Sequence, residues 1–233
     1  EGVSPFNNNN DRNSVGARVA MTRSLWDTTY RENTWIGREH AQGILPLLPK
    51  LKKIIDNRYP GTKLAITEYA YMGLSHVSGA IAQADALGIF AQNDVYMANF
   101  WGAVEGYVKT GFDLYRNYDG NGSTFGETFV QAQTNDVANT SVYASVHAAD
   151  ESKLHTIAIN KNLDSAVKVK IALTANRQYK SAKVWLVDSR SPEIKAVKNI
   201  RVINNNSFDY TLPPLTIAHF VLTEEDLSIY PYF

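Results

Sequence analysis

The chain has 233 residues, with 23 basic and 23 acidic side chains and therefore a formal net charge of zero. A neutral chain without a basic stripe argues against a nucleic-acid partner, and no apolar run approaches the roughly 18 residues that a membrane span needs. The absence of cysteine excludes disulfides, thiolate catalysis and cysteine-ligated zinc.

The start of the chain is a polar segment, followed by two runs that carry large aromatic side chains. Residues 1–20 are polar and include an Asn run, which predicts a surface loop. They contain neither an initiator Met nor a signal-peptide pattern, so we expect that a leader was removed or that the sequence starts inside a longer chain. Trp26 and Trp35 follow in polar surroundings, where they either stack on sugars or pack the loop onto the domain.

Helical and apolar segments alternate in the middle of the chain. The periodicity predicts helices at 45–59 and 78–92, a buried strand at 64–69 and a second strand at 95–100. In the second helix, Ser78 can cap the N-terminus, and we expect Asp85 to be solvated or ion-paired. This alternation is typical of a parallel α/β sheet or barrel. In that class the carboxyl ends of the strands carry the chemistry, and here these ends present Glu68 and Trp101.

From about residue 127 the pattern changes to short strands joined by polar turns. We expect strands at 142–146, 154–160, 167–174, 182–187, 200–203, 207–212 and 215–222. This pattern predicts an antiparallel β-sandwich. The segment offers no cluster of carboxylates, histidines or nucleophiles, so we expect a structural accessory role, with sugar binding as the alternative.

A short helix at 112–115 and a polar turn at 119–123 connect the two halves. The turn begins at Asp119 and alternates oxygen-bearing side chains, as part of a calcium loop does, but no Glu closes it at the required position. We expect no required cofactor, and a structural calcium remains an alternative.

The sequence lacks the motifs of several common reaction classes. It has no G-x-x-x-x-G-K-[ST] loop, no G-x-G-x-x-G after a strand and no G-x-S-x-G elbow. Its five histidines show no zinc-ligand spacing. His76, in the loop after Glu68, either touches a substrate or forms a structural hydrogen bond.

After these exclusions, catalysis by carboxyl groups is the reaction class that remains. Glycoside hydrolysis uses two carboxyl groups, which in retaining enzymes stand about 5–5.5 Å apart, one as the nucleophile and the other as acid and then base. Glu68 at a strand end suits the nucleophile. The same position also suits a member of a buried ion pair, so position alone leaves both roles open.

Several runs of this sequence closely resemble glycoside hydrolase family 44. They are residues 23–30, 35–38, 67–71, 76–90, 115–120 and 212–214. The most specific are the helix after Glu68 and the Arg-Asn-Tyr-Asp-Gly run at 116–120. The sequence departs from the usual family pattern at Thr28, Ala70 and Met72, which bears on loop shape and substrate preference.

The resemblance implies a (β/α)8-like barrel followed by an antiparallel β-sandwich, that is, an α/β plus all-β fold. On this basis residues 1–126 are the C-terminal portion of the catalytic barrel and residues 127–233 are the sandwich. The family implies a secreted, retaining endo-β-1,4-glucanase that acts on cellulose-type glucan, xyloglucan or xylan.

The resemblance also implies roles for individual residues. Glu68 corresponds to the nucleophile of the family's T-E-Y motif, and Trp101 resembles the aromatic floor beneath the sugar at the cleavage point. Tyr69, Tyr71, Trp26 and His76 are the further residues that we assign to substrate binding. No residue is assigned to a metal.

The acid/base of the family is a Glu in an Asn-Glu-Pro motif, which this sequence lacks. The resemblance starts at about the sixth barrel strand, so we expect the N-terminal barrel segment to exist as another chain or fragment. Two alternatives remain. Either the chain is a non-catalytic carbohydrate-binding or structural remnant, or it is a complete enzyme whose second carboxylate is Glu105, Asp113 or Glu127.

Overall fold

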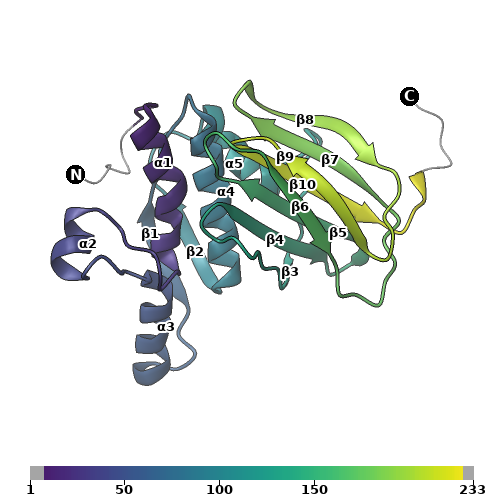
Figure 1. Cartoon of the computed structure of the whole chain (residues 1–233). Coiled ribbons are helices and arrows are strands. Elements are labelled where there is room, and N and C mark those ends of the chain that lie inside the picture. The colour runs from purple at the N-terminus through teal and green to yellow at the C-terminus, as the bar shows by residue number, and fades with distance from the viewer. Residues whose placement is uncertain (1–7, 228–233) are drawn as a thin grey trace. The chain divides into compact units, whose positions relative to one another are not determined.

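A computed structural model describes residues 8–227 of the chain (Figure 1). The chain divides into two compact units, Glu1–Gly111 and Phe112–Phe233. The division falls inside helix α5 (Gly106–Arg116), and the short helix expected at 112–115 is the C-terminal half of this element. The domain limit expected at 126–127 remains a prediction.

The first unit contains a parallel strand pair and the helices that accompany it. Its elements before α5 are α1 (Arg12–Met21), the 3-10 helix η1 (Thr22–Leu25), α2 (Trp35–His40), α3 (Leu47–Arg58), β1 (Leu64–Tyr69), α4 (Val77–Gln92) and β2 (Val95–Phe100). The predicted helices and strands of this region are confirmed to within two residues at each end. The chain runs from β1 through α4 to β2, which is the connection that a parallel pair requires.

Strands β1 and β2 lie side by side in parallel and, within the described residues, pair only with each other (Figure 1). Their sequences are apolar, yet not one residue of these two six-residue strands is buried. Parallel strands normally lie inside α/β folds with both faces covered. The expectation that 64–69 is a buried strand is therefore wrong for this chain by itself, and two open sheet edges remain.

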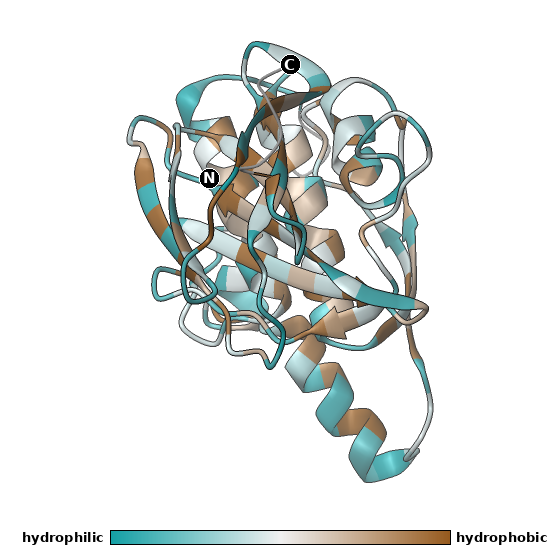
Figure 2. Ribbon diagram, turned by 90° about the vertical axis from the view of Figure 1, so that its right-hand side faces the viewer, coloured by the Kyte–Doolittle hydropathy of each residue, from teal (hydrophilic) through white to brown (hydrophobic). Residues whose placement is uncertain are grey.

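Helix α3 is amphipathic, but little of its apolar face is covered. Figure 2 shows alternating hydrophilic and hydrophobic bands along it. Leu48 is fully buried, whereas Leu47 and Ile54 are exposed. This helix and the strand pair therefore share one property, namely apolar surface that the described residues do not cover.

Helix α1 corrects the prediction of a loop over residues 1–20. Its N-cap is Asp11, whose Oδ1 accepts hydrogen bonds of 3.1 Å from the backbone N–H groups of Asn13 and Ser14. The helix packs on α4 and buries Ser14 and Arg18 along with two valines. Residues 1–7 of the expected loop lie outside the described residues.

Helix α4 begins one residue earlier than expected, and His76 caps it in place of Ser78. The Nδ1 atom of His76 accepts a 3.1 Å hydrogen bond from the Ser78 N–H. Asp85, expected to be solvated or ion-paired, is instead buried within α4 and accepts a 2.6 Å hydrogen bond from Thr22 Oγ1. Small residues along this helix allow close packing against α1, η1 and β2.

The second unit consists of antiparallel sheets, as expected for a β-sandwich. Its strands are β3 (Thr128–Val130), β4 (Thr140–His147), β5 (Asp150–Asn160), β6 (Val167–Ala172), β7 (Ser181–Asp188), β8 (Ser191–Ile200), β9 (Ser207–Leu212) and β10 (Thr216–Thr223). One sheet has the order β3-β4-β5-β10-β7-β8, and β6 pairs with β9. The strand expected at 200–203 is wrong, because the chain is extended at Ser191–Ile200 and leaves the sheet after Ile200.

The core of the second unit lies between these sheets. Its centre is Phe220 on β10, whose ring lies 5.4 Å from the Phe208 ring and 5.0 Å from the Tyr210 ring, both on β9. Leu212 and Leu222 are fully buried in the same cluster. The sandwich thus encloses its apolar side chains within one unit.

Candidate active site

Glu68 is the second-to-last residue of β1, at the carboxyl end of the strand. Its side chain is exposed. Among the described residues no donor bonds its carboxylate. An exposed carboxylate without a protein partner at a strand end is available to an incoming substrate, and the alternative of a buried ion pair does not hold in this chain.

Trp101 follows the neighbouring strand at the same level. The register places Tyr69 opposite Phe100, and the Trp101 N–H donates a 2.8 Å hydrogen bond to the Tyr69 carbonyl oxygen. The Trp101 side chain is 57% exposed. The predicted carboxylate and aromatic residue are therefore brought to adjacent strand ends, where a sugar ring can stack on one and present its anomeric carbon to the other.

The Tyr69 side chain contacts helix α4 and the neighbouring strand β2. Its ring makes edge contacts with Phe90 and Phe100 at centroid distances of 5.0 and 5.6 Å. Its hydroxyl accepts a 2.7 Å hydrogen bond from Gln83 Nε2, and burial raises the pKa of the Tyr69 hydroxyl. These contacts fix the strand end on α4. The assignment of Tyr69 to substrate binding remains a prediction.

Tyr71 and His76 lie in the loop that joins β1 to α4. Tyr71 is half-buried, and burial, followed by the charges of Asp85 and Glu32, raises the pKa of its hydroxyl. The His76 ring is occupied as the cap of α4, and burial followed by the charge of Arg18 lowers its pKa. The capping bond is the structural role that a lone histidine commonly takes, and contact of either residue with a substrate remains a prediction.

The loops after the two strands are tied to each other. Met72 and Gly73 both have left-handed φ values, of 52° and 84°. A Cβ placed on Gly102 would lie 3.3 Å from the Met72 methyl carbon, so the two loops touch there. The Tyr107 N–H donates a 2.9 Å hydrogen bond to the Leu74 carbonyl oxygen. The loop after Glu68 and the loop after Trp101 are therefore in contact, so a movement of one loop can displace the other.

Trp26 and Trp35 differ in exposure. Trp26 directly follows η1 and is half-buried, whereas Trp35 at the start of α2 is 59% exposed. Asp27 orders the turn after Trp26, because its carboxylate accepts from Arg23 Nε at 2.8 Å and from the Thr29 N–H at 2.7 Å. The structure thus places Trp26 in a rigid turn of the first unit, and its contact with a sugar remains a prediction.

The three carboxylates considered as a second catalytic group have different surroundings. Glu105 is exposed in the loop before α5. Asp113 lies within α5. Glu127 is tied to the β4–β5 hairpin, since its carboxylate bonds His147 Nδ1 at 2.9 Å and the Ala148 N–H at 2.7 Å. The Ala148 N–H and His147 lower the pKa of Glu127, which is opposite to what a general acid needs.

The turn considered for calcium is closed by its own hydrogen bonds. Asp119 Oδ1 accepts from the N–H groups of Asn121 at 2.9 Å and Ser123 at 3.2 Å, and Oδ2 accepts from Ser123 Oγ at 2.7 Å. Within residues 8–227 no group of three or more His, Cys, Asp and Glu side chains could hold a metal ion. In the same range no helix has the length and apolar character of a membrane span.

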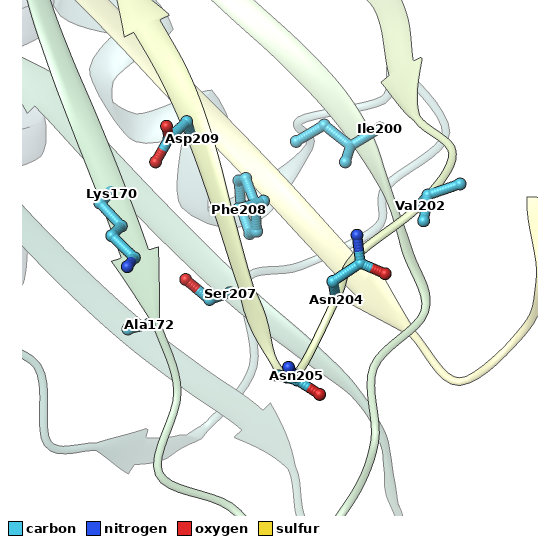
Figure 3. Close-up of a pocket in the computed structure, with 9 residues that line it drawn as sticks. All are labelled: Lys170, Ala172, Ile200, Val202, Asn204, Asn205, Ser207, Phe208 and Asp209. Atoms are coloured by element: carbon cyan, nitrogen blue, oxygen red, sulfur yellow. The ribbon is translucent and has the colours of Figure 1, made fainter.

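A hollow of about 740 Å³ lies in the second unit (Figure 3). It is lined by Lys170, Ala172, Ile200, Val202, Asn204, Asn205, Ser207, Phe208 and Asp209. Most of these residues are exposed, and the one aromatic among them, Phe208, is buried in the sandwich core. It contains none of the predicted site residues and offers no exposed ring for a sugar, so we assign no site to it.

Known proteins that resemble this chain are glycoside hydrolases. No protein-family model matches the chain. Endoglucanase A of Paenibacillus lautus is 49% identical over 208 residues, which are 88% of this chain and 30% of that protein. A Paenibacillus polymyxa xyloglucanase of glycoside hydrolase family 44 is 48% identical with a TM-score of 0.87, over 93% of this chain and 42% of its own.

The family 44 endoglucanase Cel44A of Clostridium thermocellum is 44% identical with a TM-score of 0.86, over 95% of this chain and 43% of its own. The chain thus spans less than half the length of each of these relatives. Over nearly its whole length, the chain is homologous to the endoglucanases and xyloglucanases of glycoside hydrolase family 44, as its sequence motifs predict.

Proposed function

We propose that this chain supplies the nucleophile side of a retaining endo-β-1,4-glucanase. The observation that carries the proposal is Glu68, an exposed carboxylate that no described residue bonds, near the end of a parallel strand whose neighbour leads directly into the exposed Trp101. The homology to endoglucanases and xyloglucanases supports a β-1,4-linked glucan as the substrate. Xyloglucan and xylan are alternatives within the same substrate class, and a polymer of this kind implies secretion.

The reaction divides between two carboxyl groups. Glu68 attacks the anomeric carbon and forms a covalent glycosyl ester, while a second carboxylic acid gives its proton to the departing glycosidic oxygen. Water then cleaves the ester with the second group acting as base. Trp101 would hold the sugar by stacking, which contributes about 1 kcal/mol.

We propose that the second carboxyl group belongs to the barrel segment that this chain lacks. The support is the strand pair β1–β2, which is apolar in sequence and unburied at every position, and which no other described strand joins at either edge. Further parallel strands would cover these edges and faces. The companion segment, whether a separate chain or a preceding part of the same one, completes the barrel and brings the acid/base.

The test is chemical rescue of Glu68→Gly in the assembled enzyme, with an activated aryl β-glucoside oligomer as substrate. Loss of the nucleophile should abolish turnover, and azide should restore it by attacking the anomeric carbon directly. The product is then the α-glycosyl azide, because a single displacement inverts the configuration. A β-glycosyl azide would assign Glu68 as the acid/base instead, and turnover within about tenfold of the parent would remove it from the reaction.

A matched control is Glu39→Gln, an exposed carboxylate on α2 that should leave turnover unchanged. Glu105→Gln and Asp113→Asn address the alternative of a complete enzyme in this chain, since one of them should be inactive if it supplies the acid. The remaining alternative, a carbohydrate-binding remnant, would be favoured by glucan affinity without release of reducing ends in the presence of the companion segment.

A further inference from the structure

We propose that Arg18 is a positioning residue for the Glu68 site, an inference that rests on the proposed function. Arg18 lies on α1 and is only 2% exposed. Burial of a guanidinium is costly unless acceptors satisfy its N–H groups. The acceptors that it uses connect α1 with the loop directly after the nucleophile.

The guanidinium reaches three segments with three different nitrogen atoms. Nε donates to the Tyr71 carbonyl oxygen at 3.0 Å, Nη1 to Ser78 Oγ at 2.6 Å and Nη2 to the Asn9 carbonyl oxygen at 2.8 Å. Tyr71 lies three residues after Glu68, and Ser78 lies in the first turn of α4. A planar fork with fixed donors suits such a three-way contact, whereas a single ammonium does not.

The loop between β1 and α4 approaches Arg18 closely at a glycine. Gly73 has a φ of 84°, and a Cβ at this position would lie 3.0 Å from both Cδ and Nε of Arg18. A Cβ on Gly79 would lie 2.2 Å from the Gly73 carbonyl oxygen, so α4 also touches the loop directly. Backbone and guanidinium therefore pack with no room for a side chain between them.

Asn8 bonds the same loop at two of the loop's backbone N–H groups. Its Oδ1 accepts hydrogen bonds from the Gly73 N–H at 2.9 Å and the Leu74 N–H at 3.2 Å. Arg18 thus fixes a carbonyl at one end of the loop and Asn8 fixes two N–H groups further along. On the other side of Tyr71, the Tyr69 carbonyl oxygen accepts from the Trp101 N–H.

The backbone that follows Glu68 is therefore fixed at Tyr69 by the second strand and at Tyr71 by Arg18. No residue in the described part of the chain bonds the Glu68 carboxylate, so its direction depends on this backbone. Misplacement of a reacting group by about 1 Å costs on the order of 100-fold in rate. Arg18 touches neither substrate nor reacting atoms and acts only through the loop.

The experiment uses the assembled enzyme and begins with Arg18→Ala. We expect kcat to fall by about 100-fold with a much smaller change in KM, because the position of the nucleophile depends on this loop, whereas the Trp101 backbone also stays bonded to the Tyr69 carbonyl oxygen. The variant leaves a space shaped for a guanidinium, so added ethylguanidinium should restore kcat in part. Butylammonium, which has the same charge without the planar fork, should not.

Arg58→Ala is the control, because Arg58 is an exposed arginine at the end of α3 and its removal should change neither kcat nor loop exchange. Arg18→Lys should stay as impaired as Arg18→Ala. Amide hydrogen exchange provides a readout that does not depend on activity, and Gly73 and Leu74 should exchange faster in the Arg18→Ala variant.

If Arg18→Ala does not fold, Asn8→Ala decides the question, because Asn8 is exposed and holds the same loop from its amide side. We expect faster exchange at Gly73 and a lower kcat. Unchanged exchange and kcat in a folded Arg18→Ala, or in Asn8→Ala where the former cannot be made, would overturn the inference. A parent enzyme that does not hydrolyse glucan would instead overturn the proposed function, and the inference with it.

Discussion

The two units of this chain differ in how far their large apolar side chains are buried. Within the described residues, nine large apolar side chains of the first unit are exposed, against two, Phe129 and Val202, in the second. The second unit closes a core between its own sheets, whereas the first leaves a parallel strand pair and helix α3 uncovered. One unit thus covers its apolar side chains by itself and the other does not, and the latter carries the predicted chemistry.

The largest loss of stability is expected at the centre of the core of the second unit. Phe220→Ala removes a fully buried ring in contact with two other aromatic rings. It should lower the free energy of unfolding of the second unit by about 3–5 kcal/mol. Phe129→Ala is the matched control on the same sheet, because Phe129 is 41% exposed and should cost less than about 1 kcal/mol. Similar losses in urea unfolding would contradict the contrast between core and surface.

Acid should weaken the same unit through a buried histidine pair. His155 Nδ1 lies 3.1 Å from His219 Nε2, and the Tyr118 ring packs against both imidazoles. Burial, followed by the charges of His147 and Lys153 and opposed by Asp150, lowers the pKa of His155 from 6.5 to about 4. Burial, followed by the charge of His155 and opposed by Asp119, also lowers the pKa of His219.

Because the folded-state pKa of His155 lies below its unfolded value, the unfolded chain takes up the proton first. The stability contributed by neutral His155 is complete above about pH 6.5 and is lost as the pH falls toward 4, by about 3 kcal/mol in total. Urea unfolding between pH 7 and pH 4, followed by hydrogen exchange in β5 and β10, measures this loss. The slope should be smaller in His155→Gln and unchanged in His40→Gln, which replaces an exposed histidine of the first unit. An equal slope in all three proteins would assign the loss to carboxylates.

The elements that could be predicted from the sequence are those with a regular local spacing of apolar residues. Helices α3 and α4 and strands β1 and β2 have regular apolar spacing, and Glu68 and Trp101 followed from the rule that parallel strands present chemistry at their carboxyl ends. Helix α1 was not predicted because two of its buried positions are Ser14 and Arg18, which are polar. Arg18 bonds Tyr71 and Ser78, which lie 53 and 60 residues further along the chain, beyond the reach of a local pattern. Strand β8 is a charged edge strand, so its alternation is weak.

A smaller effect is expected at the loop beside the predicted nucleophile. Gly73→Ala forces a Cβ onto a residue with a φ of 84° and places it 3.0 Å from Arg18 and from the Gly79 Cα. We expect a loss of about 1–3 kcal/mol in the first unit and faster amide exchange in the loop. Gly61→Ala is the control, because Gly61 has a φ of 85° but no neighbour within 4 Å. Equal costs would show that backbone conformation, and not contact with Arg18, decides.

The smallest effect on this chain alone is expected at its exposed strands. Met97 on β2 is 45% exposed, so Met97→Gln should change the free energy of unfolding of the isolated chain by no more than about 0.5 kcal/mol. The proposed barrel would bury this position, and an amide buried without a partner costs about 1–3 kcal/mol. The same substitution should therefore weaken binding of the companion barrel segment by about 5- to 150-fold.

Ile54→Gln separates this explanation from a general effect of lost apolar surface. Ile54 is 57% exposed on α3, away from the strand pair, and its substitution removes a similar apolar side chain. Calorimetric titration with the companion segment should give parent-like affinity for Ile54→Gln and a weaker one for Met97→Gln. If Met97→Gln binds as tightly as the parent, β2 is not a barrel interface. The exposure of β1 and β2 would then be a property of a complete fold, and the acid/base would have to be sought within this chain.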